Sequence, residues 1–117
     1  MKEFVLLFRM DITSKEAQPT EEQMKTYMQQ WTEWIDTIAN KSQLVEGGRH
    51  FSRKGRILLP GNQVIEKPYT AEDISVAGYI IILARNMEDA TVIAGKCPIL
   101  NGQNTSVEIR ETATPGS

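Results

Sequence analysis

The chain contains few of the residues that cross-link small proteins or bind metals. Among its 117 residues there is one cysteine, Cys97, and one histidine, His50. A lone cysteine cannot form a disulfide within the chain, and a lone histidine cannot supply a two-histidine zinc site. The sequence also has no glycine-rich phosphate loop and no catalytic triad. We therefore expect a cytoplasmic protein of a reducing compartment, without metal and without cofactor.

Long apolar runs and an excess of basic charge are also absent. The longest apolar stretch, residues 76–84, is well short of the roughly 20 residues that cross a bilayer, and residues 4–8 are too few for the core of a signal peptide. Thirteen basic residues stand against fifteen acidic ones, so the formal net charge is −2, whereas binding to a phosphate backbone depends on a basic excess. These features predict no membrane partner and no direct nucleic-acid partner.

What the chain does have is the composition of one folded domain. Hydrophobic residues make up 40% of the sequence and charged residues 24%, a balance typical of globular proteins. The length is that of a single ordinary domain. We predict one domain over residues 1–111 and a flexible tail over residues 112–117.

Two amphipathic helices are predicted. Thr20 and Gln23 have the spacing of a capping box. The apolar residues that follow recur at intervals of three and four and so lie on one helix face; they are Met24, Met28, Trp31, Ile35 and Ile38. This pattern predicts a helix of about 20 residues. Asn86 and Asp89 begin a second, shorter helix in a similar way, and Pro98 ends it.

Segments of strand-forming residues alternate with these helices. Their composition predicts strands at residues 3–10, 44–53, 57–59, 63–66, 76–84 and 106–110. The first of the middle segments is expected to be an edge strand. Turn signals flank residues 57–59, which are expected to form a strand or a hairpin arm, and the middle third as a whole is predicted to be a β-meander with loops. The order of elements is that of an α+β, ferredoxin-like split βαβ fold with an antiparallel sheet.

The segment 76–84 predicts a dimer, because it is apolar at every position. Such a strand is typically covered on both faces. Both predicted helices lie on one side of the sheet, so the other side needs a different cover. We predict that the sheet of a second copy provides it, in a homodimer.

This ordered set of segments resembles the YCII-related, or DGPF-type, domain family over residues 3–111. The resemblance is carried by Phe4-Val5-Leu6-Leu7-Phe8-Arg9, Glu22-Gln23-Met24, Val64-Ile65-Glu66-Lys67-Pro68-Tyr69, Ala77-Gly78-Tyr79-Ile80-Ile81-Ile82, Met87-Glu88-Asp89-Ala90, Cys97-Pro98 and Val107-Glu108-Ile109-Arg110. It implies a dimeric α+β barrel of undefined activity. The leading hypothesis for this chain is that it binds a small polar or aromatic ligand in a cavity of that barrel.

The chain departs from the family pattern at two places. The family's aspartate-glycine-proline-aromatic motif is replaced by Glu66-Lys67-Pro68-Tyr69, which loses the glycine and its ready access to positive φ. Some relatives pair a histidine at the start of the first helix with an aspartate, but this chain has Pro19-Thr20-Glu21-Glu22-Gln23 there. The catalytic dyad of those relatives is therefore not transferred, which favours ligand binding over catalysis.

His50 is the candidate catalytic residue, because it is the side chain whose unperturbed pKa lies near neutrality. Asp11 and Glu66 are candidate carboxylate partners. The enzyme hypothesis is a cofactor-free lyase, isomerase or monooxygenase-like activity on a small organic acid or phenol, with Arg9 or Arg49 orienting the anion. The competing interpretation of His50 is an exposed or hydrogen-bonded surface histidine.

The candidate ligand-binding residues are Arg9, Asp11, Arg49, Tyr69 and Tyr79. The first two alternate at the end of the first strand and should share a face, where they hold a polar ligand or form a solvated ion pair. Arg49 belongs to a basic segment that binds an anion or lies on a solvated edge. Each tyrosine joins an apolar ring to a polar tip, which suits a pocket, and Tyr79 also fits a core or dimer interface.

A third hypothesis is a protein-interaction module in transcriptional regulation. It follows from the family resemblance, since relatives are sometimes encoded beside alternative sigma factors. The partner of such a module would be a protein.

Overall fold

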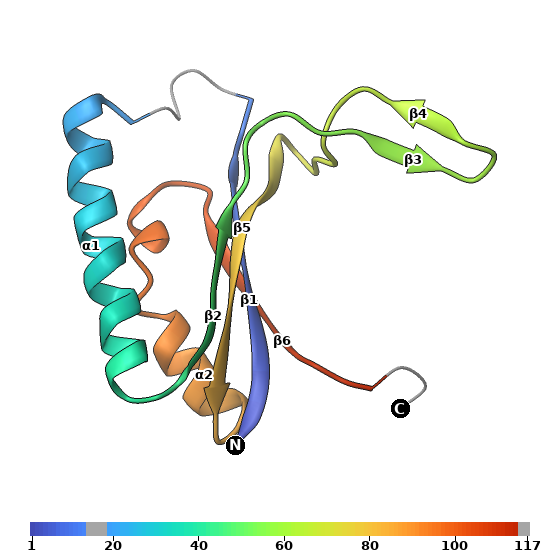
Figure 1. The fold of residues 1–117 in the computed structure, drawn as a ribbon. Coiled ribbons are helices and arrows are strands. Elements are labelled where there is room, and N and C mark those ends of the chain that lie inside the picture. Colours follow the sequence, from blue (N-terminus) through green and yellow to red (C-terminus); the bar gives the residue numbers. More distant parts are fainter. Residues whose placement is uncertain (14–18, 115–117) are drawn as a thin grey trace.

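A four-stranded antiparallel sheet with two helices against one face forms the body of the protein (Figure 1). The structure, a computed structural model, describes residues 1–13 and 19–114. The strand order is β2-β5-β1-β6, with bounds β1 Lys2–Asp11, β2 Leu44–His50, β5 Ile74–Ala84 and β6 Ser106–Glu111. The helices are α1 Glu21–Asn40, α2 Met87–Ala94 and the short 3-10 helix η1 Pro98–Asn101. This α+β architecture is compatible with the predicted ferredoxin-like fold.

Both helices begin at the residues predicted to cap them. The hydroxyl of Thr20 accepts from the backbone N–H of Gln23 at 3.1 Å, and the Gln23 side chain accepts from the N–H of Thr20 at 2.9 Å. Asn86 caps α2 by accepting from the N–H of Asp89 at 2.9 Å. Within the described ranges 1–13 and 19–114, neither helix has the length and apolar character that a membrane span needs.

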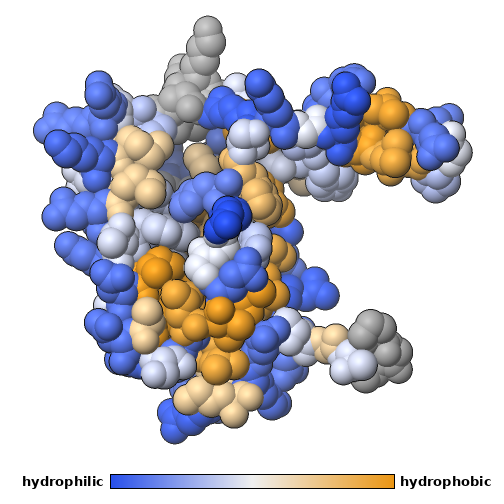
Figure 2. Space-filling model, in the orientation of Figure 1, coloured by the Kyte–Doolittle hydropathy of each residue, from blue (hydrophilic) through white to orange (hydrophobic). Residues whose placement is uncertain are grey.

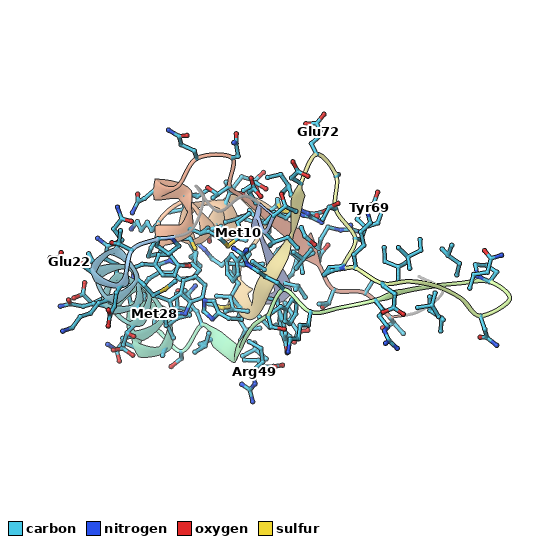
Figure 3. All side chains as sticks on the ribbon, turned by 90° about the horizontal axis from the view of Figure 1, so that it is seen from above. Met10, Glu22, Met28, Arg49, Tyr69 and Glu72 are labelled. Carbon is cyan, nitrogen blue, oxygen red and sulfur yellow. The ribbon has the colours of Figure 1, made fainter. Side chains whose placement is uncertain are left out.

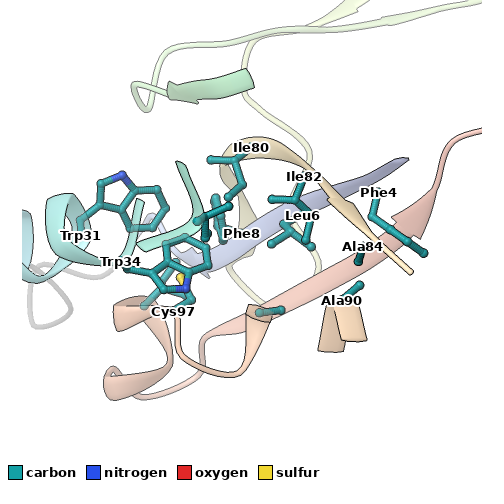
Figure 4. Packing of buried hydrophobic residues seen from close by; sticks show 13 residues of the cluster. Phe4, Leu6, Phe8, Trp31, Trp34, Ile80, Ile82, Ala84, Ala90 and Cys97 are labelled. Atoms are coloured by element: carbon teal, nitrogen blue, oxygen red, sulfur yellow. The ribbon is translucent and has the colours of Figure 1, made fainter. Parts of the chain in front are cut away.

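The core lies between the sheet and the helices (Figure 4). Phe4, Leu6 and Phe8 alternate along β1 and are almost completely buried. The Phe8 ring meets Trp31 of α1 edge-on, with centroids 4.9 Å apart. The indole N–H of Trp34 donates to the backbone carbonyl at position 93, at 3.1 Å, which ties α1 to α2. Of the helix face predicted from the apolar spacing, Trp31 and Ile38 are buried against the sheet, whereas Met24 and Met28 in the first turns of α1 are 42% and 40% exposed.

The other face of the sheet has no helix against it. In a strand, successive side chains point to opposite faces, so Val5 and Leu7 of β1 lie opposite to the buried residues. In β5, which pairs with β1 in the register Val5 with Ile81, the same holds for Ile81 and Leu83. These four side chains form a half-buried apolar patch, which we call the open sheet face. It is the face for which the sequence predicted a second copy as cover.

Only part of the predicted β-meander joins the sheet. β2 is its edge strand, as predicted, but β3 (Ile57–Leu59) and β4 (Gln63–Ile65) pair with each other as a separate two-stranded sheet. Just after β2, the backbone N–H of Phe51 donates to the carbonyl of Ala77 in β5, at 2.8 Å. Beyond it, residues 57–65 form a hairpin that projects from the body on the side opposite to the helices (Figure 1). We call this hairpin the arm.

The predicted tail begins where β6 leaves the sheet. The N–H of Thr112 still donates to the carbonyl of Glu3, at 3.0 Å. Residues 115–117, the end of the predicted tail, lie outside the described residues.

Gly48 permits a close approach between β2 and β5. Its φ is +65°, and a Cβ atom built there would lie 1.6 Å from the backbone oxygen of Tyr79. The β2–β5 register is irregular on both sides of Glu46, as expected where a bulge inserts an unpaired residue. Glycine is therefore required at position 48 by both conformation and space.

We expect Gly48→Ala to lower the free energy of unfolding by more than about 1 kcal/mol, because the new methyl group meets backbone in a left-handed conformation. The matched control is Gly47→Ala, since a Cβ at Gly47 has nothing within 4 Å. Urea unfolding of both variants measures the difference. Equal stability of the two variants would contradict this account of the strand.

Candidate functional site

A cleft lies where the arm leaves the body. Its volume is about 440 Å³, and its walls come from the end of β1, the two chain segments at the root of the arm and the start of β5. The lining side chains include Arg9, Arg56, Pro68, Tyr69, Ile74, Ser75 and Val76. The fold thus gathers two arginines, a tyrosine and aliphatic groups around one space.

Arg9 is held in this cleft by a carboxylate of the neighbouring strand. Its guanidinium forms an ion pair with Glu108 of β6, and the two side chains are 34% and 35% exposed. Arg110 contacts the other oxygen of the same carboxylate at 3.3 Å. Hydrogen bonds from Arg9 and Arg110 lower the pKa of Glu108, so Glu108 is ionised at neutral pH. A guanidinium has five N–H donors, so a single carboxylate leaves it capacity for an anionic ligand.

Arg56, at the root of the arm, brings a second positive charge to the cleft. Its Nε lies 2.8 Å from Oε2 of Glu66, with both side chains 70% exposed. Such a solvated ion pair is weak and can exchange for a ligand. A shallower hollow of about 730 Å³ continues over the arm root and is lined by Arg53, Lys54 and Lys67 in addition to Arg56. The arm root is the basic region of an acidic protein.

A buried hydroxyl holds the tyrosine loop against β5. Ser75 is 8% exposed, and its Oγ donates to the backbone carbonyl of Tyr69. Ala71 and Ile74 exchange backbone hydrogen bonds of 2.9 and 3.0 Å, which closes a tight turn after the tyrosine. The side chain of Tyr69 itself is 71% exposed beside the cleft, so its ring can stack on a ligand.

His50, the candidate catalytic residue, lies on the helix-covered face of the sheet. Its ring meets Trp31 of α1 edge-on, with centroids 4.8 Å apart. His50 is exposed overall, but desolvation of its ring lowers the pKa of His50 below its usual 6.5. Within the described part of the chain, no carboxylate contributes to that pKa. The described residues thus give His50 no orienting acid of the kind that general-base histidines commonly have.

Arg49 and Tyr79 lie together, but away from the cleft. They are paired across β2 and β5. The Arg49 guanidinium donates to the carbonyl of Gly48 at 2.9 Å, and the Tyr79 hydroxyl donates to the Glu46 carboxylate, which raises the pKa of Tyr79. In Figure 3, Arg49 projects outward from the edge strand, well apart from Tyr69 at the arm root.

Asp11 closes the end of β1. Its carboxylate accepts from the backbone N–H and the hydroxyl of Thr13, at 2.8 and 3.1 Å.

Arg9 was predicted either to hold a polar ligand or to form an ion pair. An ion pair is present, but the acid is Glu108 of β6. A partner 99 residues away in the chain could not be chosen from the sequence.

Cys97 is a buried thiol without nucleophilic character. Burial raises the pKa of Cys97 to about 12, so the thiolate that reacts is not populated at neutral pH. Burial also raises the pKa of the nearby Tyr27 to about 12. Among residues 1–13 and 19–114, no three His, Cys, Asp or Glu side chains gather as metal ligands would.

The structure therefore unites two of the five predicted ligand-binding residues, Arg9 and Tyr69, in one cleft. Arg56 belongs to the basic segment visible in the sequence. Ser75 carried no sequence signal, because it is a single polar residue just before the predicted apolar strand. Glu108 likewise looked like one solvent-facing residue of an alternating strand, and only the β1–β6 register places it beside Arg9.

The fold and the cleft define a class, a small α+β protein with a basic cleft at the root of a hairpin. No protein-family model and no curated protein matches the chain.

We expect the single histidine to titrate with a pKa below 6.5 in the folded protein. Because the unfolded chain binds the proton more readily, the contribution of His50 to stability is complete above pH 6.5 and is lost as the pH falls through the folded pKa. NMR of the imidazole C–H signals measures this pKa directly, since no other histidine contributes. A value at or above 6.5 would show that the Trp31 contact does not desolvate the ring.

Proposed function

We propose that the protein binds a small acidic molecule with an aromatic or other apolar part in the cleft at the arm root. The observation that carries this proposal is the union of Arg9, Arg56 and Tyr69 around one space with the aliphatic Ile74 and Val76. A volume of about 440 Å³ lies in the range of small-molecule sites. The proposal agrees with the ligand-binding role that the resemblance to YCII-related domains implies.

Each wall of the cleft suits one part of such a ligand. Arginine binds carboxylates through paired N–H donors; Arg9 comes from β1 and Arg56 from the root of the arm. The exposed ring of Tyr69 offers a stacking surface. The basic arm root, with Lys54 and Lys67 close by, raises the local concentration of anions.

The geometry favours binding over catalysis by His50. A base and an anion-orienting arginine must share a site for the enzyme hypothesis to work. Phe8 and His50 both lie opposite Gly78 in the sheet and face the helices, whereas Arg9 follows the register shift after Phe8 and pairs with Glu108. The sheet therefore stands between His50 and the Arg9 side chain.

We further propose that two copies associate through the open sheet face. Its centre is aliphatic, with Val5, Leu7, Ile81 and Leu83 drawn from the two middle strands. A patch that meets its own image in a two-fold dimer needs only to be complementary to itself, and a flat aliphatic face meets that condition. This is the homodimer that the strand pattern and the family resemblance predict.

The ligand proposal predicts that millimolar aromatic carboxylates, such as benzoate and phenylacetate, raise the melting temperature. A ligand at ten times its Kd adds about 1.4 kcal/mol, or roughly 5 °C for a domain of this size. Arg9→Gln and Arg56→Gln should each abolish this rise. The matched control is Arg110→Gln, which removes the other arginine on Glu108 without altering the cleft lining.

Two results would contradict the ligand proposal. One is a rise in melting temperature that survives Arg9→Gln and Arg56→Gln. The other is an unchanged wild-type melting temperature across the series of aromatic acids.

The dimer proposal predicts a mass of twice 13.2 kDa for the wild type at micromolar concentration. Leu7→Lys with Ile81→Lys should give a monomer, because it places charge in the apolar contact. Sedimentation equilibrium measures the mass, and circular dichroism verifies that the variant is folded. A wild-type monomer would contradict the proposal.

A further inference from the structure

We infer that the arm is a clasp that docks on a second copy of this chain. The inference rests on the homodimer proposed above and adds to it the element that grips the partner. It is independent of the ligand proposal, which concerns the cleft alone.

The arm is apolar on both faces. The cross-strand pairs are Ile57 with Ile65, Leu58 with Val64, and Leu59 with Gln63. Paired residues share a face of a hairpin, so Leu58 and Val64 form one apolar face, and Ile57, Ile65 and Leu59 the other. Leu58 is 66% exposed and Val64 is 47% exposed. Figure 2 shows this apolar group on the projecting arm.

The body of the same chain leaves Leu58, Leu59 and Val64 exposed, while Ile57 and Ile65 are half-buried. Among the described residues, β3 and β4 pair only with each other, and the arm extends away from the sheet (Figure 1). A two-stranded hairpin is at best marginally stable in water. One with aliphatic side chains on both faces therefore needs an external surface to pack against.

The molecule exposes too much surface for a compact monomer. A protein of 13.2 kDa typically exposes about 6,400 Å², whereas this chain exposes 8370 Å². Its radius of gyration is 15.6 Å, against about 13.4 Å for a compact chain of this length. The excess of roughly 2,000 Å² is more than the about 800 Å² that each partner buries in a standard interface.

Direction and charge identify the partner as a second copy. The arm projects on the same side of the body as the open sheet face (Figure 1), so a copy seated on that face lies within its reach. Residues 53–67 contain four basic residues and one acidic residue in a chain of net charge −2, so the rest of the chain carries −5. The four basic residues lie at the root of the arm, and this basic root of one copy is electrostatically complementary to the acidic body of the other.

The test compares two double variants in which the substituted residues are similarly exposed. Leu58→Ser with Val64→Ser removes the apolar face of the arm. The control, Val92→Ser with Leu100→Ser, removes residues that are 61% and 41% exposed on the helix side. We expect the arm variant to raise the Kd of the dimer by about tenfold or more in sedimentation equilibrium, and the control variant to leave it unchanged.

A second measurement uses the wild-type protein, so that it does not depend on how the variants fold. Equal amounts of ¹⁴N- and ¹⁵N-labelled chains are mixed and treated with an amine-reactive cross-linker. Links from Lys54 or Lys67 of one isotope to the body of the other support the clasp. Exclusively same-isotope links from these lysines in a dimeric sample, or an unchanged Kd of the arm variant, overturn the clasp and leave the sheet-face dimer standing. A wild-type monomer overturns both.

Discussion

The antiparallel pairing of β1 with β5 is the interaction on which the rest of the structure depends. Both strands are apolar along most of their length, and their register places Leu6 beside Ile80 and Phe4 beside Ile82. That register sends one set of aliphatic and aromatic side chains towards α1 and α2, and the intervening set to the opposite face. The fold has two helices and therefore covers one of the two faces. The buried core and the open sheet face are two consequences of the same pairing.

The candidate site arises where this pairing ends. The register shifts between Phe8 and Arg9, and the chain on both sides of the arm passes this end of the sheet. Arg9 is fixed by Glu108 of the adjacent strand, and Tyr69 is fixed through its carbonyl by the buried Ser75. The sheet thus anchors Arg9 and the backbone of Tyr69 next to the arm, which pairs with no other strand of the described chain. The proposed ligand site and the proposed contact with a second copy both involve the arm, the first at its root and the second along its length.

Local features of the chain were predictable, since their causes are local. The capping box at Thr20 needs only residues three apart, and the apolar spacing of α1 already includes the core residues Trp31 and Ile38. The edge position of β2 followed from its mixed composition. The sequence did not predict that β3 and β4 form a separate sheet, because a short aliphatic strand pairs equally well with a neighbour in the main sheet or with its own hairpin partner. That choice depends on where the chain leaves β5, after the bond between Phe51 and Ala77.

The sequence by itself determined the helices, the strand segments, the α+β order and the basic charge near residue 56, because each depends on residues close together in the chain. The tertiary structure alone decided which charged groups meet. His50 and Arg49 are adjacent in sequence but lie on opposite faces of β2, where a shift of one residue reverses every side chain. Arg9 and Glu108 are 99 positions apart and are joined by the β1–β6 register. Strand pairing brings together residues that are far apart in the chain. A site whose residues come from several strands therefore exists only once the sheet has formed.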